Sequence, residues 1–212
     1  MATSNEWATA EHALAYLARA DHIPHRTEGE GTLLGFVSRD ARCILDLGNG
    51  DGRLLALLKI DRPQAQAVAL DFSPPMLQAA RRRFAGDQTV SIVEHNLEAR
   101  LPDLGRFDAI VSSFAIHHCA DERKHTLYRE IYDALEPGGV FCNLEHVASP
   151  SPNMHAHFLS TLGWAPETED PSNKLLDVET QLGWLRAIGF VDVDCYWKWL
   201  ELALLVGFKP SF

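Results

Sequence analysis

The sequence predicts an α/β fold in which helices cover both faces of a doubly wound, mostly parallel sheet. From residue 41 onward, short apolar segments alternate with helical patterns, as expected of parallel strands joined by crossover helices. The apolar segments lack alternation with polar residues, which is typical of strands buried on both faces. A length of 212 residues with 46% hydrophobic composition is enough for one domain with a substantial core.

Seven segments are predicted to be strands, and four helical patterns lie between or beside them. The strands are predicted at residues 43–47, 67–70, 90–94, 109–113, 140–145, 191–197 and 202–208. The helices are predicted at residues 53–59, 75–84, 124–135 and 178–188. Pro137-Gly-Gly139 is expected to end the third of these helices, and Gly189 is a suitable C-cap for the last.

Two segments lie outside this alternation. Residues 1–40 are predicted to form a helical cap, with an alanine-rich helix at 7–20, a polar turn region at 23–31 and a short helix at 32–38. Residues 148–177 contain four prolines and a helix-like stretch near 154–162, so we predict an insertion or lid. The single domain expected for residues 1–212 therefore consists of the cap, a core at 41–147, the lid, and a closing helix and strands at 178–212.

Composition disfavours several classes of partner. The formal net charge of −10 opposes binding to phosphate backbones, and the one basic cluster, Arg81-Arg82-Arg83, is spread around a helical turn rather than forming one face. The four cysteines form no CxxC pair, which suits free thiols in a reducing compartment. With neither a signal-peptide pattern nor an apolar run of about 18 residues, a cytoplasmic protein without a membrane span is expected.

A glycine-rich segment, Asp46-x-Gly48-x-Gly50-x-Gly52, follows the first predicted strand and precedes the first helix of the core. Glycines permit a sharp turn and a close approach of backbone amides to a ligand, and the helix N-terminus adds a partial positive charge. Taken alone, this segment could equally be an ordinary tight turn between a strand and a helix.

A carboxylate at the end of the second strand favours a ligand. Asp71 lies about twenty residues past the glycines, where an acidic side chain can accept both hydroxyl groups of a ribose. The alternative is that Asp71 caps the following helix, but Ser73 already supplies a capping group there. The two segments together predict a nucleoside site, which leaves a nicotinamide dinucleotide and S-adenosylmethionine as candidate ligands.

Four ordered strings distinguish these two ligands. They are Asp46-x-Gly48-x-Gly50-x-Gly52, Leu70-Asp-Phe-Ser-Pro-x-Met76-Leu, Phe107-Asp-Ala-Ile-Val-Ser-Ser-Phe-Ala-Ile-His-His118, and Leu135-Glu-Pro-Gly-Gly139-Val-Phe. In this order they resemble the signatures of class I S-adenosylmethionine-dependent methyltransferases, in particular the small-molecule enzymes of the ubiquinone-biosynthesis type. The resemblance implies a Rossmann-like, seven-stranded sheet with an antiparallel last strand, and S-adenosylhomocysteine as the product.

The resemblance also implies which residues contact the cofactor. The implied positions are Gly48, Asn49 and Gly50 at the methionine moiety, Asp71 at the ribose, Phe72, Met76, Asn96 and Leu97 around the adenine, and Ser112 and Ser113 near the sulfonium. Members of the family commonly have an acidic residue where this chain has Asn96. An amide oxygen can still accept a hydrogen bond from the adenine amino group, although without a charge.

Candidate residues for the acceptor side follow from where the strands end. Methyl transfer is an in-line displacement that depends on alignment, and a base is needed only when the acceptor must lose a proton. His117 and His146 are the candidate bases, and each could instead be a structural histidine. Arg26, Glu145 and Trp164 are candidate acceptor-binding residues. No recognised metal-ligand spacing occurs among the histidines, cysteines and acids, so no metal is expected.

We therefore expect an enzyme that acts on a small-molecule acceptor as a monomer or homodimer, without binding nucleic acid. A protein or RNA methyltransferase is one alternative, but the Asn/Asp-Pro-Pro-Tyr/Phe string typical of base amino-methylation is replaced here by Ser112-Ser-Phe-Ala. A non-catalytic S-adenosylmethionine-binding partner subunit is the other alternative. The intact glycines and Asp71 argue against a decayed site of that kind.

Overall fold

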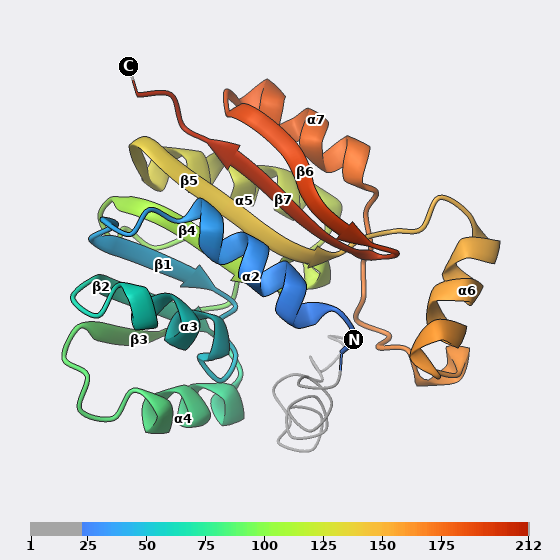
Figure 1. Cartoon of the computed structure of the whole chain (residues 1–212), viewed down its shortest axis with the longest axis horizontal. Coiled ribbons are helices and arrows are strands. Elements are labelled where there is room, and N and C mark those ends of the chain that lie inside the picture. The colour runs from blue at the N-terminus through green and yellow to red at the C-terminus, as the bar shows by residue number, and fades with distance from the viewer. Residues whose placement is uncertain (1–22, 212) are drawn as a thin grey trace.

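A computed structural model describes residues 23–211 and contains one seven-stranded sheet with the order β3-β2-β1-β4-β5-β7-β6 (Figure 1). The strands are β1 (Cys43–Leu47), β2 (Gln66–Asp71), β3 (Val90–Glu94), β4 (Phe107–Ser113), β5 (Leu135–His146), β6 (Val191–Trp199) and β7 (Leu202–Phe208). The helices are α2 (Arg26–Phe36), α3 (Arg53–Asp61), α4 (Pro74–Arg83), α5 (Asp121–Ala134), α6 (Pro152–Leu162) and α7 (Val178–Ile188), with short 3-10 helices η2 (Ile116–His118) and η3 (Pro166–Thr168).

The direction of the strands confirms the predicted sheet. β1 pairs in parallel with both β2 and β4, and β4 pairs in parallel with β5. β7 runs antiparallel to its two neighbours, β5 and β6. The chain leaves β1 toward β2 and later returns to the other side of β1 as β4, so the strand order reverses there. In open α/β sheets, ligands bind at such a reversal, outside the carboxyl ends of the strands.

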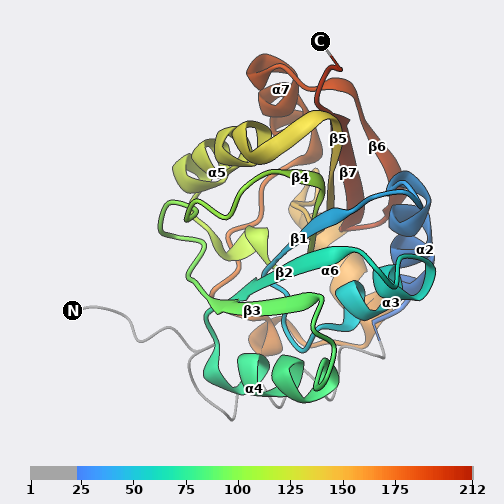
Figure 2. The same ribbon diagram turned by 90° about the vertical axis from the view of Figure 1, so that its left-hand side faces the viewer.

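Helices pack on both faces of the sheet, and two apolar clusters fill the space between the layers (Figure 2). On one face, Leu33 of α2 and Leu55 of α3 belong to the first cluster and are fully buried. On the other, Leu127 of α5 and Leu185 of α7 are fully buried in the second. No helix within residues 23–211 is long and apolar enough to cross a membrane.

The prediction for residues 23–38 was wrong in its boundaries. One helix, α2, covers Arg26–Phe36, where a polar turn followed by a short helix at 32–38 was expected. Its glycines lower the intrinsic helix propensity, but packing compensates. A Cβ atom at Gly29 would lie 2.8 Å from Leu144 and 2.9 Å from Trp197, so glycine lets α2 lie directly on the sheet. The helix expected at residues 7–20 lies outside the described residues.

The other boundaries differ by smaller amounts. α5 begins at Asp121 rather than at residue 124, and its first turn carries Asp121 and Glu122, which favour a helix N-terminus. β5 begins directly after α5, so Pro137-Gly-Gly139 lies within the first part of the strand. α6 is N-capped by Ser151, whose hydroxyl oxygen accepts from the amide of Met154 at 3.3 Å. Figure 1 shows α6 beyond the end of β5.

Candidate functional site

The glycine loop between β1 and α3 is held in a conformation that requires glycine. Gly48, Gly50 and Gly52 all have positive φ, at 65°, 58° and 88°. A Cβ at Gly48 would lie 2.1 Å from the Cβ of Ala115, so the loop packs directly against the segment after β4. By contrast, no described atom lies within 4 Å of a Cβ placed on Gly50, which leaves open space above that turn.

Asp71 joins the end of β2 to this loop. Its Oδ2 accepts from the amide of Gly50 and its Oδ1 from the amide of Ser73, each at 2.8 Å. Burial raises the pKa of Asp71, and the hydrogen bonds from the backbone amides of Ser73, Gly50 and Phe72 oppose that rise. Each carboxylate oxygen has two lone pairs, so both can accept one further donor, such as a hydroxyl group.

Asp46 and Asn49 place unsatisfied oxygen atoms beneath the same loop. Asp46 is 1% exposed, and its Oδ2 has no hydrogen-bond partner among residues 23–211. Burial raises the pKa of Asp46 to about 8, with further contributions from the charges of Asp71 and Asp51. The Oδ1 of Asn49 is likewise buried without a described partner. Such acceptors favour a nearby cation or donor.

The predicted adenine positions differ in their surroundings. Met76 and Leu97 are buried, whereas Phe72 is half-buried. Asn96 is exposed, and its Oδ1 already accepts from the amide of Glu98 at 3.0 Å. An adenine amino group at Asn96 would therefore share that oxygen with a local turn.

The two serines at the end of β4 also differ. The hydroxyl of Ser112 donates to the carbonyl of Leu47 at 2.8 Å and ties β4 to β1. The hydroxyl of Ser113 is buried and has no partner in the described part of the chain. Of the two, Ser113 retains its hydrogen-bonding capacity for a ligand.

A histidine–glutamate pair lies at the carboxyl ends of β4 and β5. His117 in η2 and Glu145 in β5 are 6% and 1% exposed, and the His117 Nδ1 lies 2.5 Å from the Glu145 Oε1. Burial raises the pKa of Glu145 to about 7, and it lowers the pKa of His117 well below the usual value, with a further contribution from His146. The Nε2 of His117 makes no hydrogen bond to any residue from 23 to 211, so it keeps its hydrogen-bonding capacity for a ligand.

His146 lies beside this pair but has a different partner. Its ring centroid is 5.6 Å from that of His117, and its Nε2 lies 2.9 Å from the Oε2 of Glu201. Glu201 was not among the site residues predicted from the sequence. Its one distinguishing signal is an acidic residue in a short turn between two apolar strands, which gives no indication of its contacts.

Arg26 begins α2, and Trp164 follows α6. Arg26 is buried, donates from Nε to Glu30 at 2.8 Å, and lies with its guanidinium carbon 5.4 Å from the centre of the Phe114 ring. Glu30 also accepts from Arg53, the first residue of α3, at 2.9 Å. Trp164, which follows α6, is half-buried against the first apolar cluster.

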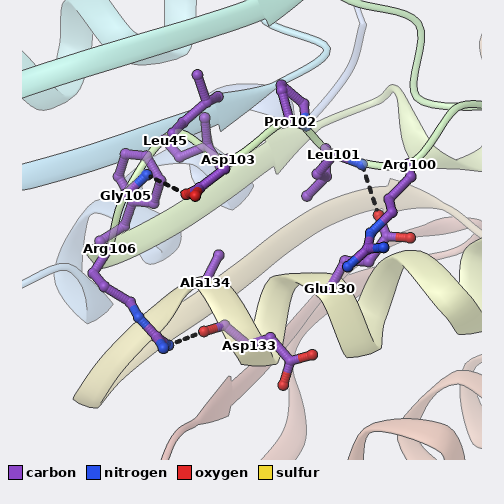
Figure 3. A pocket seen from close by; sticks show the side chains of 12 residues that line it. Leu45, Arg100, Leu101, Pro102, Asp103, Gly105, Arg106, Glu130, Asp133 and Ala134 are labelled. Atoms are coloured by element: carbon purple, nitrogen blue, oxygen red, sulfur yellow. Dashed lines mark hydrogen bonds between the residues drawn. The ribbon is translucent and has the colours of Figure 1, made fainter.

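A hollow lies at the amino end of β4, between the start of that strand and the end of α5, away from the predicted site (Figure 3). Its volume is about 350 Å³. Its polar groups are largely paired with one another: the amide of Leu101 donates to Glu130 at 2.9 Å, and Arg106 donates to the carbonyl of Asp133. This hollow contains none of the predicted site residues. Among residues 23–211, no three His, Cys, Asp or Glu side chains are grouped so as to hold a metal ion.

The chain is similar in sequence to known methyltransferases. Residues 44–139 match a family model described as a methyltransferase domain. The demethylmenaquinone methyltransferase of Thermus thermophilus is 40% identical over 109 residues, which are 50% of this chain and 48% of that protein. The enzyme of the same name from Clavibacter sepedonicus is 34% identical over 167 residues, 71% of this chain and 66% of that protein. This chain thus spans about half to two thirds of these relatives.

Solved structures share the fold. Human N-acetylserotonin methyltransferase, solved in complex with S-adenosylmethionine, superposes with a TM-score of 0.70 at 18% identity. The superposition covers 97% of this chain and 58% of the human protein.

Proposed function

We propose that this chain, which belongs to the class I S-adenosylmethionine-dependent methyltransferases, transfers a methyl group from S-adenosylmethionine to a small-molecule acceptor. One observation carries the proposal: at the point where the strand order reverses, Asp71 is bonded to the glycine loop, and the His117–Glu145 pair lies at the carboxyl ends of the next two strands. The proposed nucleoside site and the proposed proton acceptor therefore lie at the same end of the parallel strands.

The residues around the glycine loop fit the cofactor. Asp71 would accept the ribose hydroxyls with its remaining lone pairs, and the open space over Gly50 leaves room for the methionine moiety. Asp46 is proposed to face the amino group of that moiety with its unpartnered Oδ2 and to give up its proton when that cation binds. Phe72, Met76, Asn96 and Leu97 are proposed to surround the adenine. When bound, S-adenosylmethionine supplies an electrophilic methyl group on a positively charged sulfur.

His117 is proposed as the general base, in preference to His146. In the tautomer with its proton on Nδ1, His117 donates to Glu145 and keeps a lone pair on Nε2 that can take a proton from the acceptor. With the cofactor bound, the Nε2 of His117 would take the acceptor's proton as the methyl group moves to the acceptor atom. The electron pair of the broken carbon–sulfur bond would stay on sulfur, which gives S-adenosylhomocysteine and the methylated acceptor as products.

The remaining predicted residues are assigned to the walls of the site. Ser113, Glu145 and His146 are proposed to border the methyl-transfer region, whereas Ser112 supports the backbone of β1. Arg26 is proposed to act with Glu30 and Arg53 in fixing α2 against the start of α3. Trp164 is proposed to close the acceptor side from the lid.

The acceptor is proposed to be a small aromatic molecule. Two relatives are named demethylmenaquinone methyltransferase, which supports a quinone-like acceptor. Three rings lie side by side at the proposed methyl-transfer region. The ring centroid of His146 lies 5.6 Å from that of His117 and 5.4 Å from that of Phe158. The net charge of −10 argues against an RNA acceptor.

Calorimetry with S-adenosylmethionine and S-adenosylhomocysteine tests the cofactor assignment. Asp71→Ala is expected to weaken binding by roughly 1–3 kcal/mol, because hydrogen bonds to a charged group are lost. Asp103→Ala, at the distant hollow, is the matched control and should bind as the wild type does. If neither compound binds the wild type, the proposed function is wrong.

A screen for methyl transfer from labelled S-adenosylmethionine to phenols, quinols and amines tests the acceptor assignment. His117→Ala is expected to reduce turnover by roughly 10²–10⁴-fold while cofactor affinity stays unchanged. His125→Ala, on α5 against Trp184, is the control. Full activity of His117→Ala would exclude His117 as the base.

A further inference from the structure

Glu201 is a buried carboxylate that none of the assignments above uses. It lies in the two-residue turn between β6 and β7 and is fully buried. Its carbonyl accepts from the amide of Val147 at 2.8 Å, which fixes the turn against the end of β5. A buried carboxylate requires hydrogen-bond donors, so its partners are informative.

Three side chains from three segments donate to Glu201. The Nε2 of His146 lies 2.9 Å from Oε2, and the Nδ1 of His155 in α6 lies 2.9 Å from Oε1. The hydroxyl of Ser149 also donates to Oε1. Burial by itself would raise the pKa of Glu201, but these hydrogen bonds outweigh it and the pKa is lowered. An ionised carboxylate only accepts, so each nitrogen that faces it carries a proton.

This arrangement determines the tautomer of His146. With the proton on Nε2, a neutral imidazole has a lone pair on Nδ1. The ring of His146 lies edge-on to that of His117, at 72° and 5.6 Å between centroids. The two rings are therefore neighbours at the carboxyl ends of β4 and β5.

We propose that Glu201 is a positioning residue of the acceptor site. It holds His146 so that Nδ1 accepts a hydrogen bond from the acceptor, and through His155 it fastens α6 beside the same ring. The acceptor class that fits both histidines has two neighbouring hydroxyl or amino groups: one gives its proton to His117, and the other donates to His146. The acceptor part of this inference rests on the proposed function, whereas the tautomer and the fastening are properties of the chain alone.

Nitrogen-15 NMR of histidine-labelled wild-type protein tests the tautomer without any substrate. At pH 7.5, two-bond proton–nitrogen correlations are expected to show His146 protonated at Nε2 and unprotonated at Nδ1. The signals are assigned by their loss in His146→Gln. A proton on Nδ1, in either the other tautomer or the doubly protonated ring, would overturn the proposal.

Two matched variants separate Glu201 from a general effect on α6. Glu201→Gln can donate as well as accept, so the fixed tautomer of His146 is expected to be lost. Glu169 is the other carboxylate near His155, and its Oε2 lies 3.2 Å from the Nε2 of that ring. Glu169→Gln should leave the tautomer of His146 unchanged. An unchanged His146 tautomer in Glu201→Gln, or an equal change in both variants, would refute the role of Glu201.

A third variant covers the case in which Glu201→Gln does not fold. His155→Asn keeps the contact between Glu201 and His146 but removes the imidazole that joins Glu201 to α6. Hydrogen exchange of the α6 amides is expected to speed up by about tenfold or more, with the His146 tautomer preserved. Unchanged exchange in α6 would show that Glu201 does not fasten this helix.

Turnover provides the last readout, with an acceptor found in the screen. Glu201→Gln is expected to lower kcat/KM by about tenfold or more for an acceptor with two neighbouring hydroxyls, and by much less for its single-hydroxyl analogue. Cofactor affinity should stay within about twofold of the wild type. Equal losses for both acceptors would contradict the specificity role. If the wild type transfers no methyl group to any acceptor, the proposed function fails, and the NMR result still decides the tautomer.

Discussion

Asp46→Asn should stabilise the protein in a strongly pH-dependent way. Asp46 is 1% exposed, its Oδ2 lacks a described hydrogen-bond partner, and burial raises its pKa from 3.8 to about 8. Because the folded state holds this proton more tightly than the unfolded state, the free energy of unfolding decreases as pH rises from about 4 to about 8. Asparagine does not titrate, so the variant lacks this loss.

The magnitude follows from the size of the shift. Each unit of pKa difference corresponds to about 1.4 kcal/mol, so a shift of roughly four units gives a full effect of about 5–6 kcal/mol. Between pH 5 and pH 8, the stability advantage of Asp46→Asn should therefore grow by about 4 kcal/mol. Other titrating groups occur in both proteins and cancel in the difference.

Urea unfolding at pH 5, 6, 7 and 8 without cofactor measures this difference directly. Asp103→Asn, at an exposed position, is the control and should show a constant difference from the wild type. A constant difference between the wild type and Asp46→Asn over the same range would refute the buried-acid reasoning. Repeating the series with saturating S-adenosylhomocysteine tests the counter-charge, because Asp46→Asn should gain less from the ligand than the wild type.

Three further predictions concern the loop, the cap and the lid. Gly48→Ala should destabilise the protein and abolish cofactor binding in calorimetry, because its Cβ would lie 2.1 Å from that of Ala115. Gly31→Ala is the control and should be tolerated, since a Cβ there would meet open space. Normal cofactor binding by Gly48→Ala would contradict this packing argument. Glu30→Gln should lower the free energy of unfolding in urea by about 3–5 kcal/mol, because two arginines lose a buried counter-charge. A decrease of less than about 1 kcal/mol would contradict this role of Glu30. The pKa of His155 is raised, mainly by its hydrogen bond to the buried carboxylate of Glu201. The attachment of α6 should therefore weaken as pH rises above that pKa, and the α6 amides should exchange hydrogen faster. Protection of these amides that does not change with pH would contradict this prediction.

The contact between the glycine loop and Asp71 was predictable because its signals are local in sequence. Glycines at fixed offsets, followed by Asp71 at the end of the next strand, lie within one strand–helix–strand unit. Such a unit has a fixed handedness and brings its strand ends together, so the contact between Gly50 and Asp71 follows from topology. The sheet was predictable for the same reason, since each strand is a distinct apolar run between turn residues.

The boundaries that were wrong depend on tertiary contacts. α2 contains glycines at positions that intrinsic propensity assigns to turns, and the close approach of Gly29 to Leu144 and Trp197 favours the helix. No pattern within residues 23–38 encodes that contact, because Trp197 lies on a strand near the other end of the chain. Asn96 is a related case: its family position was recognisable, but not the use of its side chain in a local turn.

The proposed acceptor side was less predictable because it consists of polar pairs that are distant in sequence. His117 and Glu145 are 28 residues apart, and His146 and Glu201 are 55 apart. From sequence, His146 was preferred to His117 as the candidate base, although both lie where a strand ends. The partner distinguishes them: Glu145 binds the Nδ1 of one ring and Glu201 the Nε2 of the other, so the rings present different nitrogens to a ligand. The choice of His117 as base thus depends on which carboxylate each histidine meets, and the fold determines that pairing by placing the β6–β7 turn against the end of β5.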